Sequence, residues 1–208
     1  MGIQAAAKAS AKGLDRKDLT GPALRTFFRI ADAWGLKEPE QMRLLGLESR
    51  STFQSWKRGV VAALPKDALE RISYVMGIYK GLQILLPKTA DEWVRKPNKA
   101  QVFGGASALD RMMSGNVADL YVVRQYVDGQ RGCPVDIPTS EVRWTPCYRI
   151  IPSRFPPISL FEAVADPADL EAVYAIEAMT NDRLRDEAGE LSLVPPEDRV
   201  SGPGTSAI

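Results

Sequence analysis

A short polar segment after residue 49 has the side chains that proteins use to read nucleic acids. Arginine and lysine bind phosphates or guanine edges, glutamine pairs with adenine, and hydroxyls bind phosphates or either base. Phe53 and Trp56 are three residues apart in this segment, so on a short helix they would share the buried face and leave the polar residues outside. The candidate DNA contacts are Arg50, which we expect on a phosphate, and Ser51, Thr52, Gln54, Ser55, Lys57 and Arg58.

A second polar surface is expected on a helix that Asn116 can cap and that the glycines after residue 128 end. Apolar residues recur along it at Leu120, Val123 and Val127, the spacing of a buried stripe. Arginines on the other side would suit carboxylates or phosphates. A solvated face and a surface that binds another protein both remain open. The side chains expected to point away from the stripe are Tyr121, Arg124, Gln125, Tyr126 and Arg131.

Histidine is absent from the sequence. Its absence excludes Ser-His-Asp triads, Cys-His dyads and HExxH zinc sites. Cys133 and Cys147 lack the close spacing of a structural zinc site and are too few for a disulfide scaffold, so we interpret them as thiols of a reducing cytosol. Gly104-Gly105 lacks the lysine and hydroxyl of a phosphate-binding loop and is expected to form a turn.

Two further pairs of charged residues are candidates for a catalytic or nucleotide-binding site. Glu171 and Glu177 are six residues apart on a predicted helix, which places them on different faces and argues against a shared acid–base site. Arg149 and Arg154 could hold a nucleotide pyrophosphate, but without the rest of such a pocket we interpret them as structural. The sequence therefore predicts no catalytic residue, no metal ligand and no cofactor.

Three short helices would position the segment after residue 49. Each has apolar residues at helical spacing and each ends at a glycine. Ser49 or Ser51 can cap the third helix. Helix, glycine turn and helix within about 20 residues is the helix-turn-helix arrangement, in which the second helix faces the major groove. The three helices are predicted over residues 20–35, 39–46 and 49–59.

Further helices are predicted from Pro65 to before Pro87, at 91–94, at 108–114 after a Ser107 cap, and from Asn116. Beyond Cys133, prolines separate short β-prone pieces such as 147–151, and Asp166-Pro167 begins a last helix. A strand without partners is marginal in water, and a lone helix persists only if it docks. We therefore expect residues 133–208 to be weakly ordered and cleaved first, leaving a protease-resistant core of roughly 20–132.

Charge is distributed unevenly, although 27 Lys and Arg nearly balance 26 Asp and Glu. The net charge is +5 for residues 1–60, +4 for 61–160 and −8 for 161–208. A basic head is typical of a polyanion-binding module, although two domains of unrelated pI would look the same. No apolar run approaches the roughly 18 residues of a membrane span, and Met1–Lys17 lacks a signal-peptide core, so we expect a cytoplasmic protein with no membrane partner.

Residues 20–132 resemble antitoxins of the Xre/MbcA/ParS type, in which a helix-turn-helix precedes a small helical toxin-binding domain. The resemblance lies in the helix-turn-helix at 40–59, in Gly77-Ile78-Tyr79-Lys80, in Trp93-Val94-Arg95-Lys96-Pro97-Asn98, and in Gly104-Gly105-Ala106-Ser107-Ala108-Leu109-Asp110 followed by Met113-Ser114-Gly115. It implies binding to operator DNA and a C-terminal helix that plugs the toxin's NAD pocket. The toxin-binding residues would be Tyr121, Arg124, Gln125 and Arg131.

Residues 148–208 resemble the opening of a RES-domain toxin, the NAD-degrading partner of such antitoxins. The resemblance lies in residues 148–157, Phe161-Glu162, Ala165-Asp166-Pro167 and residues 191–206. The Arg, Glu and Ser that name the family lie on later elements, which this chain does not reach. The resemblance therefore implies a toxin part that is cut short and lacks its catalytic residues.

Together these patterns predict a mainly α protein. We expect a flexible leader (1–19), a helix-turn-helix domain (20–81), a toxin-binding domain (82–132), a linker (133–147) and an incomplete α/β RES-like segment (148–208). The predicted function is a non-enzymatic antitoxin of a type II toxin-antitoxin system that represses its own promoter as a homodimer and neutralises a RES-domain toxin. The alternatives are a fused toxin and antitoxin that degrades NAD in its complete form, and an interaction scaffold without DNA binding.

Overall fold

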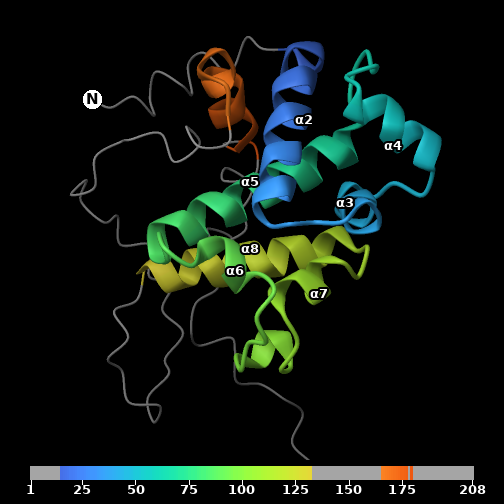
Figure 1. Cartoon of the computed structure of the whole chain (residues 1–208). Coiled ribbons are helices and arrows are strands. Elements are labelled where there is room, and N and C mark those ends of the chain that lie inside the picture. The colour runs from blue at the N-terminus through green and yellow to red at the C-terminus, as the bar shows by residue number, and fades with distance from the viewer. Residues whose placement is uncertain (1–14, 133–164, 178, 180–208) are drawn as a thin grey trace, which may run out of the picture.

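Helices make up the described part of the molecule (Figure 1). The computed structural model describes residues 15–132, 165–177 and 179. Within these ranges there is no strand, and extended backbone pairs only at an isolated bridge between Pro97 and Ser107. The elements are α2 (Arg16–Ala33), α3 (Glu38–Leu45), α4 (Arg50–Lys57), α5 (Lys66–Leu85), α6 (Ala90–Trp93), η1 (Gln101–Phe103), α7 (Ala108–Met112), α8 (Val117–Gly132) and η2 (Pro167–Asp169), which continues as a helix over 170–177.

α5 is the central helix of the fold. α2 packs on one side of it and α8 on the other, as Figure 1 shows. Most α5 residues between Ala68 and Leu82 are buried, including Gly77 and Gly81. A helix that is buried nearly all round belongs to the core of a domain. One continuous apolar cluster therefore runs from Leu19 on α2 through α5 and α8 to Ile176.

The first helix begins earlier than the sequence predicted. α2 starts at Arg16 instead of Thr20, because Asp15 and Asp18 form a capping box in which each side chain accepts a backbone N–H of the other residue. Pro22 therefore lies inside the helix. Thr20 is buried, and its hydroxyl donates to the Arg16 carbonyl and accepts from the Leu64 N–H.

The other helices predicted within residues 36–132 are confirmed within a residue or two at their ends. Gly104 and Gly105 have positive φ and form the expected turn. Ser107 and Asp110 form the predicted capping box at the start of α7, with the Asp110 N–H donating to the Ser107 hydroxyl at 3.0 Å. The cysteines, the strand at 147–151 and the linker lie outside the described residues.

The helix over residues 170–177 docks against the helical domain. The sequence predicted that this helix would persist only if it docked in this way. Asp166 caps it by accepting from the Ala168 N–H, as predicted. Val173 and Ile176 are fully buried in the common core. In Figure 1 this helix lies beside α2. Residues 165–177 are thus part of the folded body. The protease-resistant core of roughly 20–132 stays a prediction.

Candidate DNA-binding and partner-binding surfaces

The turn between α3 and α4 depends on one glycine. Gly46 adopts φ +70°, a left-handed conformation that favours glycine, and the Leu47 N–H then donates to the Met42 carbonyl at 2.9 Å. Ser49 caps α4, with its hydroxyl accepting from the Thr52 N–H at 3.3 Å. The predicted helix-turn-helix is therefore present, and Ser49 is the cap of the two candidate serines.

α4 buries its aromatic face, as the sequence predicted. Phe53 and Trp56 are 0% and 6% exposed. The Phe53 ring meets Phe28 of α2 edge to face, with 5.8 Å between centroids, and this contact holds α4 against α2. The candidate DNA contacts lie on the remaining surface: Arg50, Ser51, Lys57 and Arg58 are exposed, and Thr52, Gln54 and Ser55 are half-buried.

Glu38 at the start of α3 binds two of the candidate DNA contacts. Its carboxylate accepts from Arg50 Nε at 2.7 Å and from Gln54 Nε2 at 3.0 Å. The Arg50 side chain is 78% exposed in this pair, so the pair contributes little to stability. Glu38 therefore orients both side chains. No local pattern pointed to Glu38, because it precedes Arg50 by 12 residues.

Further positive charge lies next to α4. A groove between α2 and the end of α4 is lined by Lys17 and Lys57, and by Arg25, whose guanidinium is paired with Asp169. The Lys57 ammonium also lies 6.0 Å from the centroid of the Phe28 ring. No local pattern predicts that Lys17 adjoins the α4 surface, because Lys17 and Lys57 are 40 residues apart in the sequence.

Arg124 does not point into solvent, which corrects the sequence prediction. It is 2% exposed, and its guanidinium donates to Asp128 (Nε to Oδ2, 2.6 Å) and to Glu177 (Nη2 to Oε1, 3.1 Å). Burial opposes the charged form, but Asp128 and Glu177 outweigh it and raise the pKa of Arg124. Arg124 therefore holds α8 to the helix over 170–177 and is not available to a partner in this conformation.

The rest of the predicted α8 surface is divided. Gln125 is exposed, and its Nε2 donates to the Tyr121 hydroxyl at 2.6 Å. Tyr121 is half-buried because its ring packs edge to face on Tyr74 of α5. Tyr126, also expected outside, stacks on Trp93 and meets the buried Phe103 edge to face at 4.9 Å. Arg131 lies on α8, but its side chain is outside the described residues.

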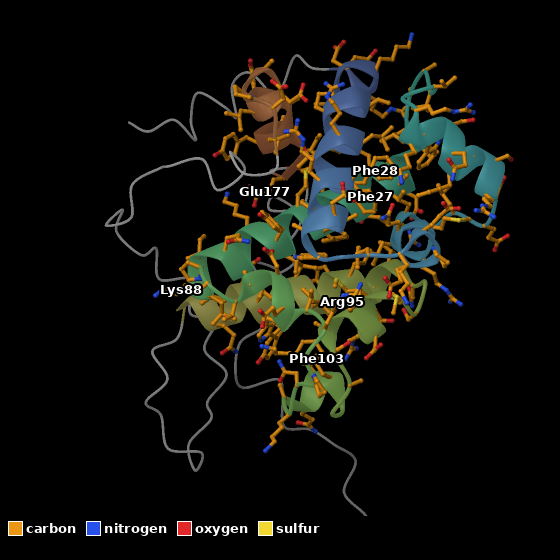
Figure 2. All side chains as sticks on the ribbon, in the orientation of Figure 1. Phe27, Phe28, Lys88, Arg95, Phe103 and Glu177 are labelled. Atoms are coloured by element: carbon orange, nitrogen blue, oxygen red, sulfur yellow. The ribbon has the colours of Figure 1, made fainter. Side chains whose placement is uncertain are left out.

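Arg95 joins the C-terminal part of this body to the helix-turn-helix. It donates to the Trp34 and Gly35 carbonyls at the end of α2 (2.9 and 2.6 Å) and to the Glu40 carboxylate of α3 (Nη2 to Oε2, 3.0 Å). Burial tends to raise the pKa of Glu40, but the hydrogen bond from Arg95 and that from the Lys37 N–H lower it overall. Figure 2 labels Arg95 at this junction. No local pattern predicts this contact of Arg95, because Trp34 lies 61 residues earlier in the chain.

Glu171 is exposed and Glu177 is 5% exposed, so the two carboxylates lie on different faces, as predicted. No group of three or more His, Cys, Asp or Glu in the described ranges could hold a metal ion. Every described helix is too short or too polar to cross a bilayer. Arg149 and Arg154 lie outside these ranges.

Two family models match this arrangement. Residues 13–77 match the antitoxin Xre-like helix-turn-helix domain, and residues 82–132 match the antitoxin Xre/MbcA/ParS C-terminal toxin-binding domain. Both are regulatory domains of antitoxins and not enzymatic domains. Their junction falls within α5, the helix on which both halves pack.

Two curated proteins of Sinorhizobium fredii (strain NBRC 101917 / NGR234) are similar to the chain. The uncharacterized protein y4oB is 50% identical over 111 residues, which are 52% of this chain and 84% of y4oB. The uncharacterized protein y4oC is 47% identical over 45 residues, so the match spans 22% of this chain and a fifth of y4oC. No solved structure matches the chain. The chain therefore belongs to the Xre/MbcA/ParS family and is an antitoxin of an Xre-type toxin-antitoxin system, because both antitoxin domains match it and it covers most of y4oB at 50% identity.

Proposed function

We propose that the protein binds operator DNA as a homodimer through α4 and represses its own promoter. The observation that carries this proposal is the division of α4 into a buried aromatic face and a polar face with Lys57 and Arg58 exposed. Lys57 and Arg58 would contact phosphates or guanine edges, Gln54 an adenine, and Arg50 a phosphate. Ser51, Thr52 and Ser55 would contribute hydroxyls. A dimer is expected because one helix-turn-helix covers few base pairs and usually reads two half-sites.

Gel shifts with the promoter upstream of the gene test the DNA-binding surface. Lys57→Ala with Arg58→Ala should weaken binding and reduce the slope of log affinity against log salt by about 2 if both residues contact phosphates. Lys88→Ala with Lys99→Ala removes the same charge from exposed positions on the other domain, and it should leave the slope unchanged. Equal slopes for the two double variants would show that α4 is not the recognition helix.

The second proposed activity is neutralisation of a RES-type, NAD-degrading toxin by residues 82–132. The matched toxin-binding domain supports a toxin partner, and the RES identity rests on the resemblance of residues 148–208. Gln125, Tyr121 and Arg131 on α8 would contact the toxin, and Gln125 is exposed. Arg124 would act from inside the fold by fixing α8 through Asp128 and Glu177.

A NAD-consumption assay tests the toxin-binding surface. Added protein should stop NAD loss by a purified RES-type toxin, and Gln125→Glu with Arg131→Glu should raise the concentration needed for half inhibition at least tenfold. Gln101→Glu with Lys99→Glu is a control at exposed positions outside α8 with the same change in charge. If both double variants inhibit like the wild type, the toxin contact lies elsewhere.

The same assay without toxin separates the antitoxin from a fused toxin. We expect the purified chain alone to leave NAD intact. Steady NAD loss in proportion to the chain would instead support a toxin part that retains activity.

A further inference from the structure

Residues 165–177 pack against α2, α5 and α8, and we call the surface of these three helices that the segment covers the groove. Ala165, Val173, Ala175 and Ile176 are buried in the common core at 0–4% exposure, while Glu171 on the opposite face is exposed. The segment is therefore amphipathic, and its apolar side covers a surface made by helices of the two antitoxin domains.

Two acidic residues frame the apolar side of this segment. Asp169 accepts a bidentate pair from Arg25 of α2, with both N–O distances 2.7 Å. Glu177 accepts from Lys80 of α5 at 3.1 Å and from Arg124 of α8 at 3.1 Å. The two acids are eight residues apart, about 12 Å along a helix. Their carboxylates are 9% and 6% exposed, so each needs the cations that face it.

The groove holds these cations in place to face the segment. Arg124 reaches Glu177 across Gly77 of α5, where any Cβ would collide with its guanidinium. The Lys80 ammonium lies 5.6 Å from the centroid of the Tyr174 ring and so touches the segment at two places. Figure 2 shows Glu177 on the segment where it meets α5. Three cations from three helices thus bind two carboxylates of one segment.

The groove and its occupant belong to different parts of the chain. Arg25 and Arg124 lie inside the two matched antitoxin domains, whereas residues 165–177 lie beyond both. The relative y4oB is about 132 residues long, since 111 residues are 84% of it, and is therefore much shorter than the 208-residue chain.

We propose that the groove of α2, α5 and α8 is a recognition site for an acidic amphipathic helix, and that residues 165–177 occupy it in place of the same kind of helix on a separate partner protein. The partner helix would carry carboxylates eight residues apart, with apolar residues at the fourth and seventh positions after the first, as in Asp169, Val173, Ile176 and Glu177. This site lies apart from the exposed α8 surface around Gln125, and it does not depend on the toxin being of the RES type.

Exchange after cleavage of the linker tests this proposal on the full chain. A specific protease site placed within residues 140–160 leaves the segment tethered before cleavage and untethered after it. A fluorescent peptide of residues 163–180 should not bind the uncut chain, because the tethered helix is present at high effective concentration. It should bind the cut chain, measured by anisotropy, while circular dichroism follows the helix content.

Peptide variants make the readout specific. Glu177→Gln should weaken binding at least tenfold, whereas Glu171→Gln, which removes the same charge from the exposed face, should bind like the parent peptide. Arg25→Asp in the chain should weaken the parent peptide at least threefold, and Asp169→Arg in the peptide should restore part of that loss.

Three outcomes would overturn the proposal. They are equal binding of the Glu171→Gln and Glu177→Gln peptides, equal peptide binding before and after cleavage, and unfolding of the chain on cleavage, which would make the segment an inseparable part of the core. None of these outcomes bears on operator binding or on toxin inhibition, so failure here is distinguishable from failure of the proposed function.

Discussion

Gly77→Ala adds one methyl group at the most crowded point of α5. The Gly77 Cα faces the Arg124 guanidinium so closely that the new Cβ and the guanidinium cannot both keep their places. A flexible surface arginine would simply move aside. Arg124 is 2% exposed and is bonded to Asp128 and Glu177, so its displacement breaks a buried ion pair.

The magnitude follows from two opposing effects. Alanine in place of glycine inside a helix favours folding by about 1 kcal/mol. Separating one partner of a buried ion pair costs about 3–5 kcal/mol. The free energy of unfolding should therefore fall by about 3 kcal/mol, which for a chain of this size corresponds to a decrease in Tm of roughly 6–12 °C.

Thermal and urea unfolding followed by circular dichroism at 222 nm measures this effect. Gly129→Ala is the matched control, because Gly129 lies on α8 with no atom within 4 Å of the position that a Cβ would take. That substitution should leave the stability equal or raise it by up to about 1 kcal/mol. If Gly77→Ala is as stable as Gly129→Ala, Arg124 does not depend on the gap at Gly77 and the buried network is misread.

Three further measurements test the junctions of the fold. Ser107→Ala removes the hydroxyl that caps α7 and should lower the free energy of unfolding in urea by about 1 kcal/mol, whereas an unchanged value would deny the cap a role. Arg95→Ala should lower it by about 2 kcal/mol, because it leaves two backbone carbonyls and Glu40 without their donor, and Lys96→Ala, which breaks an exposed pair, should cost under about 0.5 kcal/mol. The lowered pKa of Glu40 means that its contribution to stability is fully present above the ordinary carboxyl pKa of the unfolded chain and is lost as the pH falls through the lower pKa of the folded state. Between pH 6 and 3 the Glu40→Gln variant should therefore lose less stability than the wild type, and parallel curves for the two would contradict this assignment.

Local patterns were enough to predict the helices and their order. Phe53 and Trp56 indicated the buried face of α4, Gly46 the turn before it, and Ser107 with Asp110 the cap of α7. Each of these signals acts over three or four residues, the distance between neighbouring turns of a helix. The start of α2 was the exception, because Asp15 and Asp18 form a cap upstream of the proline that seemed to mark the first turn.

The position of Arg124 shows where such patterns stop. In the sequence Arg124 lies beside Gln125, and the helical pattern placed both residues on one polar surface. Its true environment depends on Gly77, 47 residues earlier, and on Glu177, 53 residues later. A helical pattern shows which residues share a face but not which neighbouring helix has a gap to receive a long side chain. The same limit explains why Tyr126, which packs on Phe103, was expected in solvent.

By itself, the sequence determined the helical fold class, the helix-turn-helix and the division of α4 into a buried and a polar face, because backbone hydrogen bonding and apolar periodicity are local properties. Only the tertiary structure decided that Arg95 joins the toxin-binding part to α2 and α3, and that residues 165–177 dock on the antitoxin domains through Asp169 and Glu177. Buried charges are stable only beside opposite charges, and here those opposite charges lie on segments far apart in the chain.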